Sequence, residues 1–147
     1  MKKKILITAC YLVLPLLFSL VSACSKTPAE EAILANIHSM QQAAEDKKPR
    51  AAVEYLADGF AGNQGVDKMT LRRIMVGLFL RHQNVHVTIP RMDINVNPQD
   101  QYSASMEGVV ILAGAENILP QDGRMYKVSG DWQYIDGEWM LVRARWE

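Results

Sequence analysis

The spacing of apolar residues changes twice along this chain, which divides it into a leader, a helical part and a strand part. Residues 5–21 form an almost unbroken apolar run behind three lysines. Ile33, Ile37 and Met40 then recur at the spacing of one helix face. From Val85 onward, apolar and polar residues alternate, as they do in half-buried strands. The pattern predicts helices first and strands afterwards.

The first helix is predicted from strong start signals. Thr27 can cap it, Pro28 suits the first helical position, and Glu30 can complete a capping box. Pro49 ends it, because proline lacks the amide hydrogen that a helix interior needs. We therefore expect a long first helix with one buried face.

Two further helices are predicted before the strands. A short one covers about residues 49–57 and ends at Asp58-Gly59, where glycine suits a left-handed position. The other runs from a cap at Asp67 to about Arg81, and apolar side chains occupy more than one of its sides. We expect this third helix to be the most buried of the three.

Four long strands are predicted after the helices. The apolar set moves from odd positions before Pro90 to even positions after Arg91, which requires an extra residue and indicates a β-bulge. The dipeptide Asp136-Gly137 is a strong signal for a type I′ hairpin turn. The expected strands cover residues 85–96, 102–113, 124–135 and 138–146, with a loop over 114–123.

The order of these elements indicates an α+β fold. A strongly curved antiparallel sheet leaves a concave side that must be filled, and the helices are the only elements that can fill it. We therefore expect a cone-shaped sheet of about four long strands wrapped around three N-terminal helices.

Residues 56–60 read Leu-Ala-Asp-Gly-Phe, and residues 132–139 form a closing hairpin of the type W-x-x-x-D-G-x-W. These two segments resemble the nuclear transport factor 2-like superfamily, which includes SnoaL-like cyclases and ketosteroid isomerases. The resemblance covers residues 28–147 and implies a cystatin-like cone. It leaves the function open, because members include isomerases, cyclases, dehydratases, transport factors and plain binding domains.

The segment from Leu20 to Cys24 resembles the lipobox of bacterial lipoproteins. Small residues precede Cys24, after a basic region and an apolar run. The resemblance implies that Cys24 is lipidated and becomes the first mature residue. Ser25 carries no retention signal, which implies the outer membrane; an uncleaved anchor or an ordinary cut at Ala23 stays open. The implied organisation is a signal peptide at 1–23, a lipidated tether at 24–27 and a domain at 28–147.

Cysteine count and charge narrow the possible functions. Cys10 leaves with the leader and Cys24 carries the lipid, so the mature domain holds no free thiol and no disulfide. Sixteen basic residues balance sixteen acidic ones, and losing the leader lysines leaves a net charge of about −3. This charge argues against nucleic-acid binding. The acyl chains are therefore expected to hold the protein at the membrane.

The alternation of the strands turns their acidic side chains away from the concave side. Asp93 and Asp131 are expected to point outward, and Glu138 lies at the hairpin rim. An isomerase-type mechanism needs an inward carboxylate base and an acidic hydrogen-bond donor, so no catalytic residue is assigned. A helix end separates His82 from His86, so no metal site and no cofactor are predicted.

Two sets of residues are candidates for binding. Aromatic side chains at the open end of the cone can line an apolar pocket, although a small domain also needs large side chains in its core. The pocket candidates are Tyr55, Phe60, Phe79, Tyr126, Trp132 and Tyr134. The outward positions of the last strand offer a second surface, because tryptophan and arginine are enriched at binding hot spots. The interface candidates are Trp139, Leu141, Arg143 and Arg145.

These observations predict an envelope lipoprotein with a single domain that faces the periplasm. The domain is expected to bind a small apolar ligand or a partner without catalysis, and the partner is either a second copy or another envelope protein. The alternative is a small isomerase- or cyclase-type enzyme that acts in the cone pocket.

Overall fold

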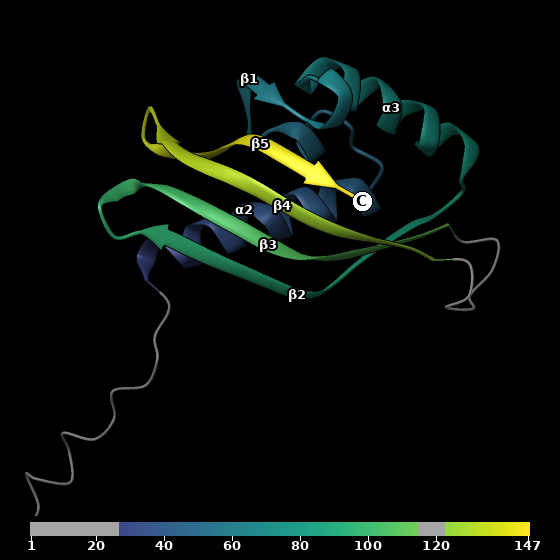
Figure 1. Cartoon of the computed structure of the whole chain (residues 1–147). Helices are drawn as coiled ribbons and strands as arrows, with labels where there is room; N and C mark the ends of the chain where they lie inside the picture. Colours follow the sequence, from purple (N-terminus) through teal and green to yellow (C-terminus); the bar gives the residue numbers. More distant parts are fainter. Residues whose placement is uncertain (1–26, 115–122) are drawn as a thin grey trace, which may run out of the picture.

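A curved five-stranded sheet with a long helix against one face forms the frame of the molecule (Figure 1). The computed structural model describes residues 27–114 and 123–147. The strand order is β1-β5-β4-β3-β2, with β1 parallel to β5 and all other neighbours antiparallel. The elements are α2 (Pro28–Glu45), η2 (Ala51–Val53), β1 (Leu56–Ala61), η3 (Asn63–Gly65), α3 (Lys68–Arg81), β2 (Val85–Asn97), β3 (Asp100–Gly114), β4 (Arg124–Ile135) and β5 (Glu138–Trp146). The predicted α+β fold is confirmed.

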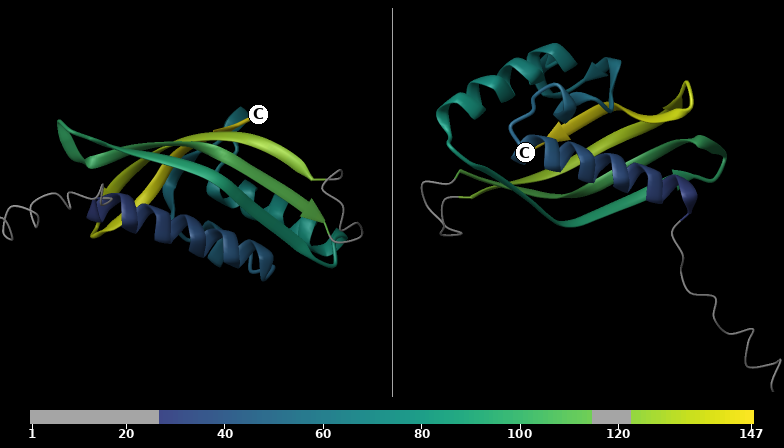
Figure 2. Two further views of the ribbon diagram at one scale, coloured as in Figure 1. Left: turned by 90° about the horizontal axis from the view of Figure 1, so that it is seen from below. Right: turned by 180° about the vertical axis from the view of Figure 1, so that it is seen from behind.

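The long helix α2 lies against the concave face of the sheet (Figure 2). Its predicted capping box is present: the Thr27 amide donates to Glu30 Oε2 at 3.1 Å, and the Glu30 amide donates to Thr27 Oγ1 at 3.3 Å. Ile33 and Ile37 are buried and pack in the same core as Trp132. The prediction of a long first helix with one buried face is confirmed.

The predicted second helix is wrong. Only Ala51–Val53 forms a 3₁₀ turn, and Leu56–Ala61 is the edge strand β1. β1 pairs with β5 and buries Leu56 and Phe60 in the core. Pairing and burial at the sheet edge outweigh the local helical spacing. The sheet therefore has five strands rather than four, and the described residues contain two α-helices rather than three.

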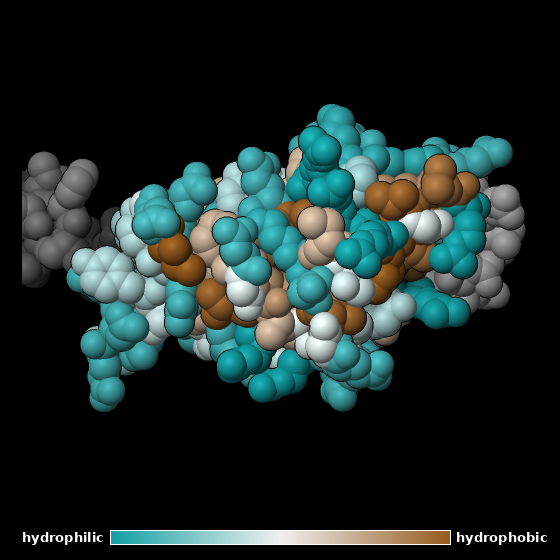
Figure 3. Space-filling view, turned by 90° about the horizontal axis from the view of Figure 1, so that it is seen from above, coloured by the Kyte–Doolittle hydropathy of each residue, from teal (hydrophilic) through white to brown (hydrophobic). Residues whose placement is uncertain are grey.

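The helix α3 has the predicted bounds, but the prediction that it is the most buried helix is wrong. Phe79 is its only buried residue, whereas Leu80 is 84% exposed and Ile74 is 45% exposed. α3 lies beside β1, because α2 already occupies the concave face (Figure 2). A view from above shows apolar side chains open to solvent among hydrophilic ones (Figure 3).

The predicted bulge in β2 is confirmed. Thr88 pairs with Ile111, but Arg91, three residues later, pairs with Val109, only two residues away on β3. β2 therefore contains one extra residue at this point. Its side chains change faces there, so that Val87 is buried before the bulge and Met92 packs against the core after it.

A second bulge, in β5, reverses part of the predicted strand register. Asp131 pairs with Arg143 and Trp132 pairs with Leu141, so Val142 is the extra residue. Trp139 and Leu141 therefore face the core, at 6% and 5% exposure. The prediction that these two residues face outward is wrong.

The hairpin between β4 and β5 turns at Asp136-Gly137, as predicted. Both residues have positive φ angles, 52° for Asp136 and 92° for Gly137, which is the conformation of a type I′ turn. The glycine accommodates its angle without steric cost. Within residues 27–114 and 123–147, no helix combines the length and the apolarity needed to cross a membrane.

Candidate functional site

The concave side of the sheet retains a small apolar pocket between the two helices and the strands. Its volume is about 240 Å³. Trp132 and Leu141 form part of its sheet wall, Ile37 and Met40 come from α2, and Met75 comes from α3. We call this space the inner pocket. Apolar side chains that border an unfilled space are typical of sites for apolar ligands.

Four methionines border the inner pocket: Met40, Met75, Met92 and Met106. Met106 is buried, and its Sδ atom accepts a hydrogen bond from Trp132 Nε1 at 3.1 Å. The other three are only partly buried. Methionine side chains are flexible and polarisable, so this lining can adapt to ligands of different shape.

A larger hollow of about 480 Å³ adjoins the inner pocket. It opens where α3 ends, β2 and β4 begin and β3 ends, and we call it the outer hollow. Its apolar wall includes Phe79 and Tyr126. The residues that border both spaces are Ala44, Met75, Val87 and Leu112. The two spaces therefore adjoin each other at these four residues, and together we call them the path.

Basic side chains lie at the opening of this path. Arg81, His82 and Arg124 border the outer hollow, and we call these three residues the basic mouth. Arg81 Nε donates to the Gly77 carbonyl oxygen at 3.0 Å. The His82 ring packs on Gly114, where an added Cβ atom would lie 2.9 Å from Nδ1. The Arg81 bond lies within α3, whereas the His82 contact joins the end of the helix to the end of β3.

The six aromatic pocket candidates lie in different parts of the molecule. Phe79 and Tyr126 border the outer hollow, Trp132 borders the inner pocket, and Phe60 is a core residue. Tyr55 and Tyr134 border a separate hollow of about 560 Å³ near the β4–β5 hairpin. Three of the six, Phe79, Tyr126 and Trp132, thus border the path under α2.

The hairpin hollow also contains Trp139, one of the interface candidates. The ring centroids of Tyr134 and Trp139 are 5.6 Å apart, and those of Tyr102 and Tyr134 are 6.1 Å apart. These contacts place Trp139 in an aromatic cluster rather than on an outer surface. Only Arg143 and Arg145 of the predicted interface set remain exposed on the outer face.

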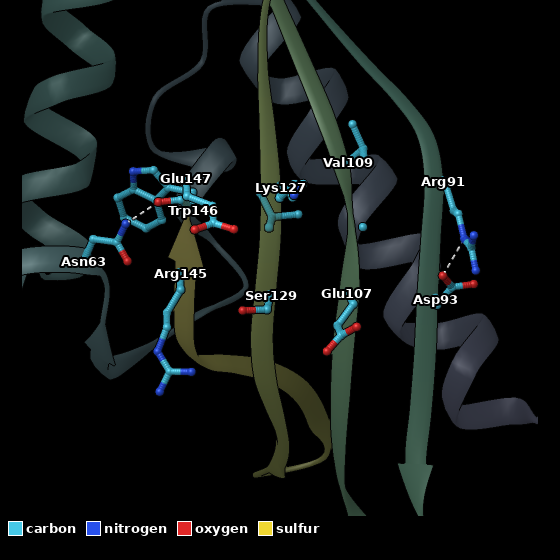
Figure 4. Close-up of a pocket in the computed structure, with 12 residues that line it drawn as sticks. Asn63, Arg91, Asp93, Glu107, Val109, Lys127, Ser129, Arg145, Trp146 and Glu147 are labelled. Carbon is cyan, nitrogen blue, oxygen red and sulfur yellow. Dashed lines mark hydrogen bonds and ion pairs between the residues drawn. The ribbon is translucent and has the colours of Figure 1, made fainter.

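The outer face of the sheet is polar and contains an open hollow of about 890 Å³ (Figure 4). One row across four strands reads Asp93, Glu107, Ser129 and Arg145, each paired with the next. Arg91 Nε lies 2.6 Å from Asp93 Oδ2. Asp93 lies on this face, as the strand pattern predicts. The same face therefore presents both signs of charge to solvent.

The helix end predicted between His82 and His86 is present in the structure. His82 follows the last residue of α3, and His86 lies on β2 with an exposed side chain. Among residues 27–114 and 123–147, no three His, Cys, Asp or Glu side chains come together as metal ligands.

Cys24, the leader and most of the predicted 114–123 loop lie outside the described residues.

The basic mouth is the part of the site that the sequence pattern did not indicate. Arg81 ends a helix and Arg124 begins a strand, far apart in the sequence. No sequence motif near either residue indicates that the two lie close together. The only sequence signal is the loop between the predicted strands 102–113 and 124–135: the strand ends must meet there, which places residue 124 near the opening.

The fold is shared with solved structures of low sequence identity. An NTF2-like (nuclear transport factor 2-like) protein of unknown function from Pseudomonas putida is 12% identical, with a TM-score of 0.70, over 83% of this chain and 87% of that chain. A protein of unknown function with a cystatin-like fold from Nostoc punctiforme is 15% identical, with a TM-score of 0.64, over 80% and 89%. A proposed scytalone dehydratase from Novosphingobium aromaticivorans is 12% identical, with a TM-score of 0.60, over 80% and 82%.

Neither a protein-family model nor a curated protein sequence matches this chain. The structural relatives establish an open cone of the cystatin-like, nuclear transport factor 2-like type, as the hairpin resemblance implies. At these identities the likeness concerns the fold alone.

Proposed function

We propose that the domain binds a small apolar molecule in the path formed by the inner pocket and the outer hollow, without changing it chemically. The observation that carries the proposal is that the two spaces adjoin each other and share wall residues from α2, α3, β2 and β3. A volume of about 480 Å³ for the outer hollow falls within the usual range for small-molecule sites.

The side chains along this path support binding rather than acid–base chemistry. The described residues that border the two spaces include no carboxylate. Gln41 borders the inner pocket, but its Nε2 atom donates to the Val87 carbonyl oxygen at 2.7 Å. An isomerase-type reaction needs a base within hydrogen-bond distance of the substrate. Asp93, which the sequence analysis considered as a possible base, lies on the opposite face of the sheet.

The binding proposal is tested by filling the path with a side chain. Ala44→Phe puts an aromatic ring at the wall shared by both spaces, and Ala35→Phe puts the same ring on the exposed side of α2. The uncharged fluorophore N-phenyl-1-naphthylamine serves as the probe. We expect the Ala44→Phe variant to bind it at least about tenfold more weakly and the Ala35→Phe variant to match wild type. Equal binding by both variants, with unchanged circular dichroism, would refute the proposal.

A small enzyme is the second candidate. Tyr126 and His82 border the outer hollow and can donate or accept a proton. Solved relatives with this fold include a proposed scytalone dehydratase and a proposed aromatic ring hydroxylase. A bound molecule that wild type alters and that the Tyr126→Phe, His82→Ala double variant leaves unaltered would favour the enzyme.

The same proposal includes a lipid anchor at Cys24 and an outer-membrane location facing the periplasm. The support is the sequence before Cys24 and the start of α2 directly after the tether. α2 is 18 residues long, about 27 Å at the usual rise per residue. The outer hollow is bordered by Ala44 near the C-terminal end of α2, whereas Thr27 caps the opposite end of this helix. An anchored domain would therefore direct its opening away from the membrane.

Metabolic labelling with a fatty-acid analogue tests the anchor. We expect label on wild type and none on Cys24→Ala. Equal labelling of the two proteins would remove the anchor from the proposal and leave the binding site as it stands. Recovery of the labelled protein in the inner-membrane fraction would contradict the outer-membrane location.

A further inference from the structure

We infer that the ligand is a single-chain amphiphile whose anionic head group binds at the basic mouth while its apolar chain occupies the path. This inference rests on the proposed function and adds the chemical class of the ligand. The apolar lining alone does not determine this class; the charge at the opening and the size of the two spaces do.

The described residues at the opening carry charge of one sign. Arg81, His82 and Arg124 border the outer hollow, and the described residues around it include no acidic side chain. Glu45 lies nearby on α2, but its Oε1 atom accepts a hydrogen bond from the Val87 amide at 2.9 Å. A carboxylate, sulfate or phosphate head group would meet cationic donors here, and arginine binds such groups through two parallel hydrogen bonds.

The two mouth arginines differ in their partners from Arg91 and Arg143 of the outer face. Arg91 and Arg143 each pair with an aspartate of a neighbouring or the same strand, at 2.6 Å and 3.2 Å. Within the described part of the chain, neither Arg81 nor Arg124 forms an ion pair. Their guanidinium groups therefore keep donors available for a ligand, whereas those of Arg91 and Arg143 are already engaged.

The volumes of the two spaces favour one small chain. The outer hollow measures about 480 Å³, but the inner pocket beyond it measures only about 240 Å³. The wall at the junction consists of Ala44, Met75, Val87 and Leu112, all of which are apolar. An unbranched chain can follow this path towards Trp132, and burial of each methylene group contributes to affinity.

Other hollows on the described surface lack this combination. The hollow near the hairpin contains Glu138 as its charged residue, and the outer face carries acidic and basic side chains together. An anionic amphiphile is therefore best matched at the basic mouth.

The test compares three ligands with the same tail as competitors of N-phenyl-1-naphthylamine on the purified domain. Laurate carries an anionic head, its methyl ester carries none, and dodecyltrimethylammonium carries a cation, all used below their micellar concentrations. We expect laurate to displace the probe at about five- to tenfold lower concentration than the ester, and the cation to be weakest. This preference should shrink at high salt, because mobile ions screen exposed charges.

Charge-removing variants locate the head group. In the double variant Arg81→Gln, Arg124→Gln, laurate and its ester should compete equally, while the affinity for the ester stays at the wild-type value. Arg143→Gln, on the outer face, is the matched control and should keep the full preference for laurate. Equal competition by laurate and the ester on wild type would overturn the inference and leave the proposed binding function intact.

Two other outcomes separate the explanations further. If wild type binds neither the probe nor any of the three ligands, the proposed function itself fails. If instead the domain floats with phosphatidylglycerol vesicles through Arg81 and Arg124 but laurate displaces no probe, the mouth binds a membrane surface and the single-chain ligand is refuted.

Discussion

α2 and α3 carry apolar side chains at similar helical spacing, yet the sheet buries only one of them. Ile33 on α2 is fully buried, whereas Leu80 on α3 is 84% exposed. α2 lies along the concave face, and α3 lies beside the edge strand β1 (Figure 2). A helical apolar pattern therefore does not show how much of a helix the rest of the fold can cover.

Hydrogen bonds to the sheet reinforce this difference. Asn36 Nδ2 donates to the Trp139 carbonyl oxygen at 3.0 Å, and Gln41 Nε2 donates to the Val87 carbonyl oxygen at 2.7 Å. These bonds fix α2 to β5 near one edge of the sheet and to β2 at the other edge. α3 instead borders the unfilled part of the concave side through Met75 and Phe79. α2 therefore both stabilises the fold and borders the proposed binding path, whereas α3 contributes mainly to the wall of that path.

The core beneath α2 should give the largest loss of stability. Trp132 is 1% exposed and its indole donates to Met106 Sδ. We expect Trp132→Ala to lower the free energy of unfolding by about 3–5 kcal/mol, because a large cavity forms among residues that cannot collapse into it. Urea unfolding followed by circular dichroism measures the change. A loss below about 1 kcal/mol would mean that this core is already loosely packed.

The two helices can be compared directly with one truncation in each. Ile33→Ala removes a fully buried side chain from α2, and we expect a loss of about 2–5 kcal/mol. Leu80→Ala removes a side chain that is 84% exposed, and we expect a change within about 0.5 kcal/mol. A comparable loss from both would show that another molecule covers the outer side of α3 in solution.

Local signals were sufficient for most elements of the fold. The capping residues Thr27 and Asp67 mark the starts of both helices, and Asp136-Gly137 marks the hairpin. The change of register at Pro90 reveals the first bulge, because alternation is clear on both sides of it. These features depend on residues close together in the sequence.

The errors concern features that depend on distant residues or on ambiguous patterns. β1 forms because it pairs with β5, and nothing near Leu56 in the sequence indicates that pairing. The bulge at Val142 lies at the end of an apolar run from residue 139 to 142, where alternation gives no face assignment. For the same reason the sequence located three aromatic residues of the path but not Arg81 and Arg124, which only the folded sheet brings together.

The smallest expected effect concerns the start of α3. Asp67 Oδ1 accepts a hydrogen bond from the Thr70 amide at 2.6 Å, and this bond, with help from Arg73, holds the pKa of the Asp67 carboxyl below its ordinary value. A carboxyl with a lowered pKa stabilises the folded state above its unfolded pKa of about 4, and this contribution disappears as the pH falls through the lower folded value.

Asp67→Asn isolates this charge, because asparagine can also cap a helix. We expect wild type to be more stable than the variant near neutral pH and the difference to shrink below about pH 4. Urea unfolding of both proteins over this pH range measures it. A difference that stays constant with pH would contradict this prediction. It would mean that Asp67 caps α3 through its hydrogen bond alone, as the uncharged Thr27 does at the start of α2.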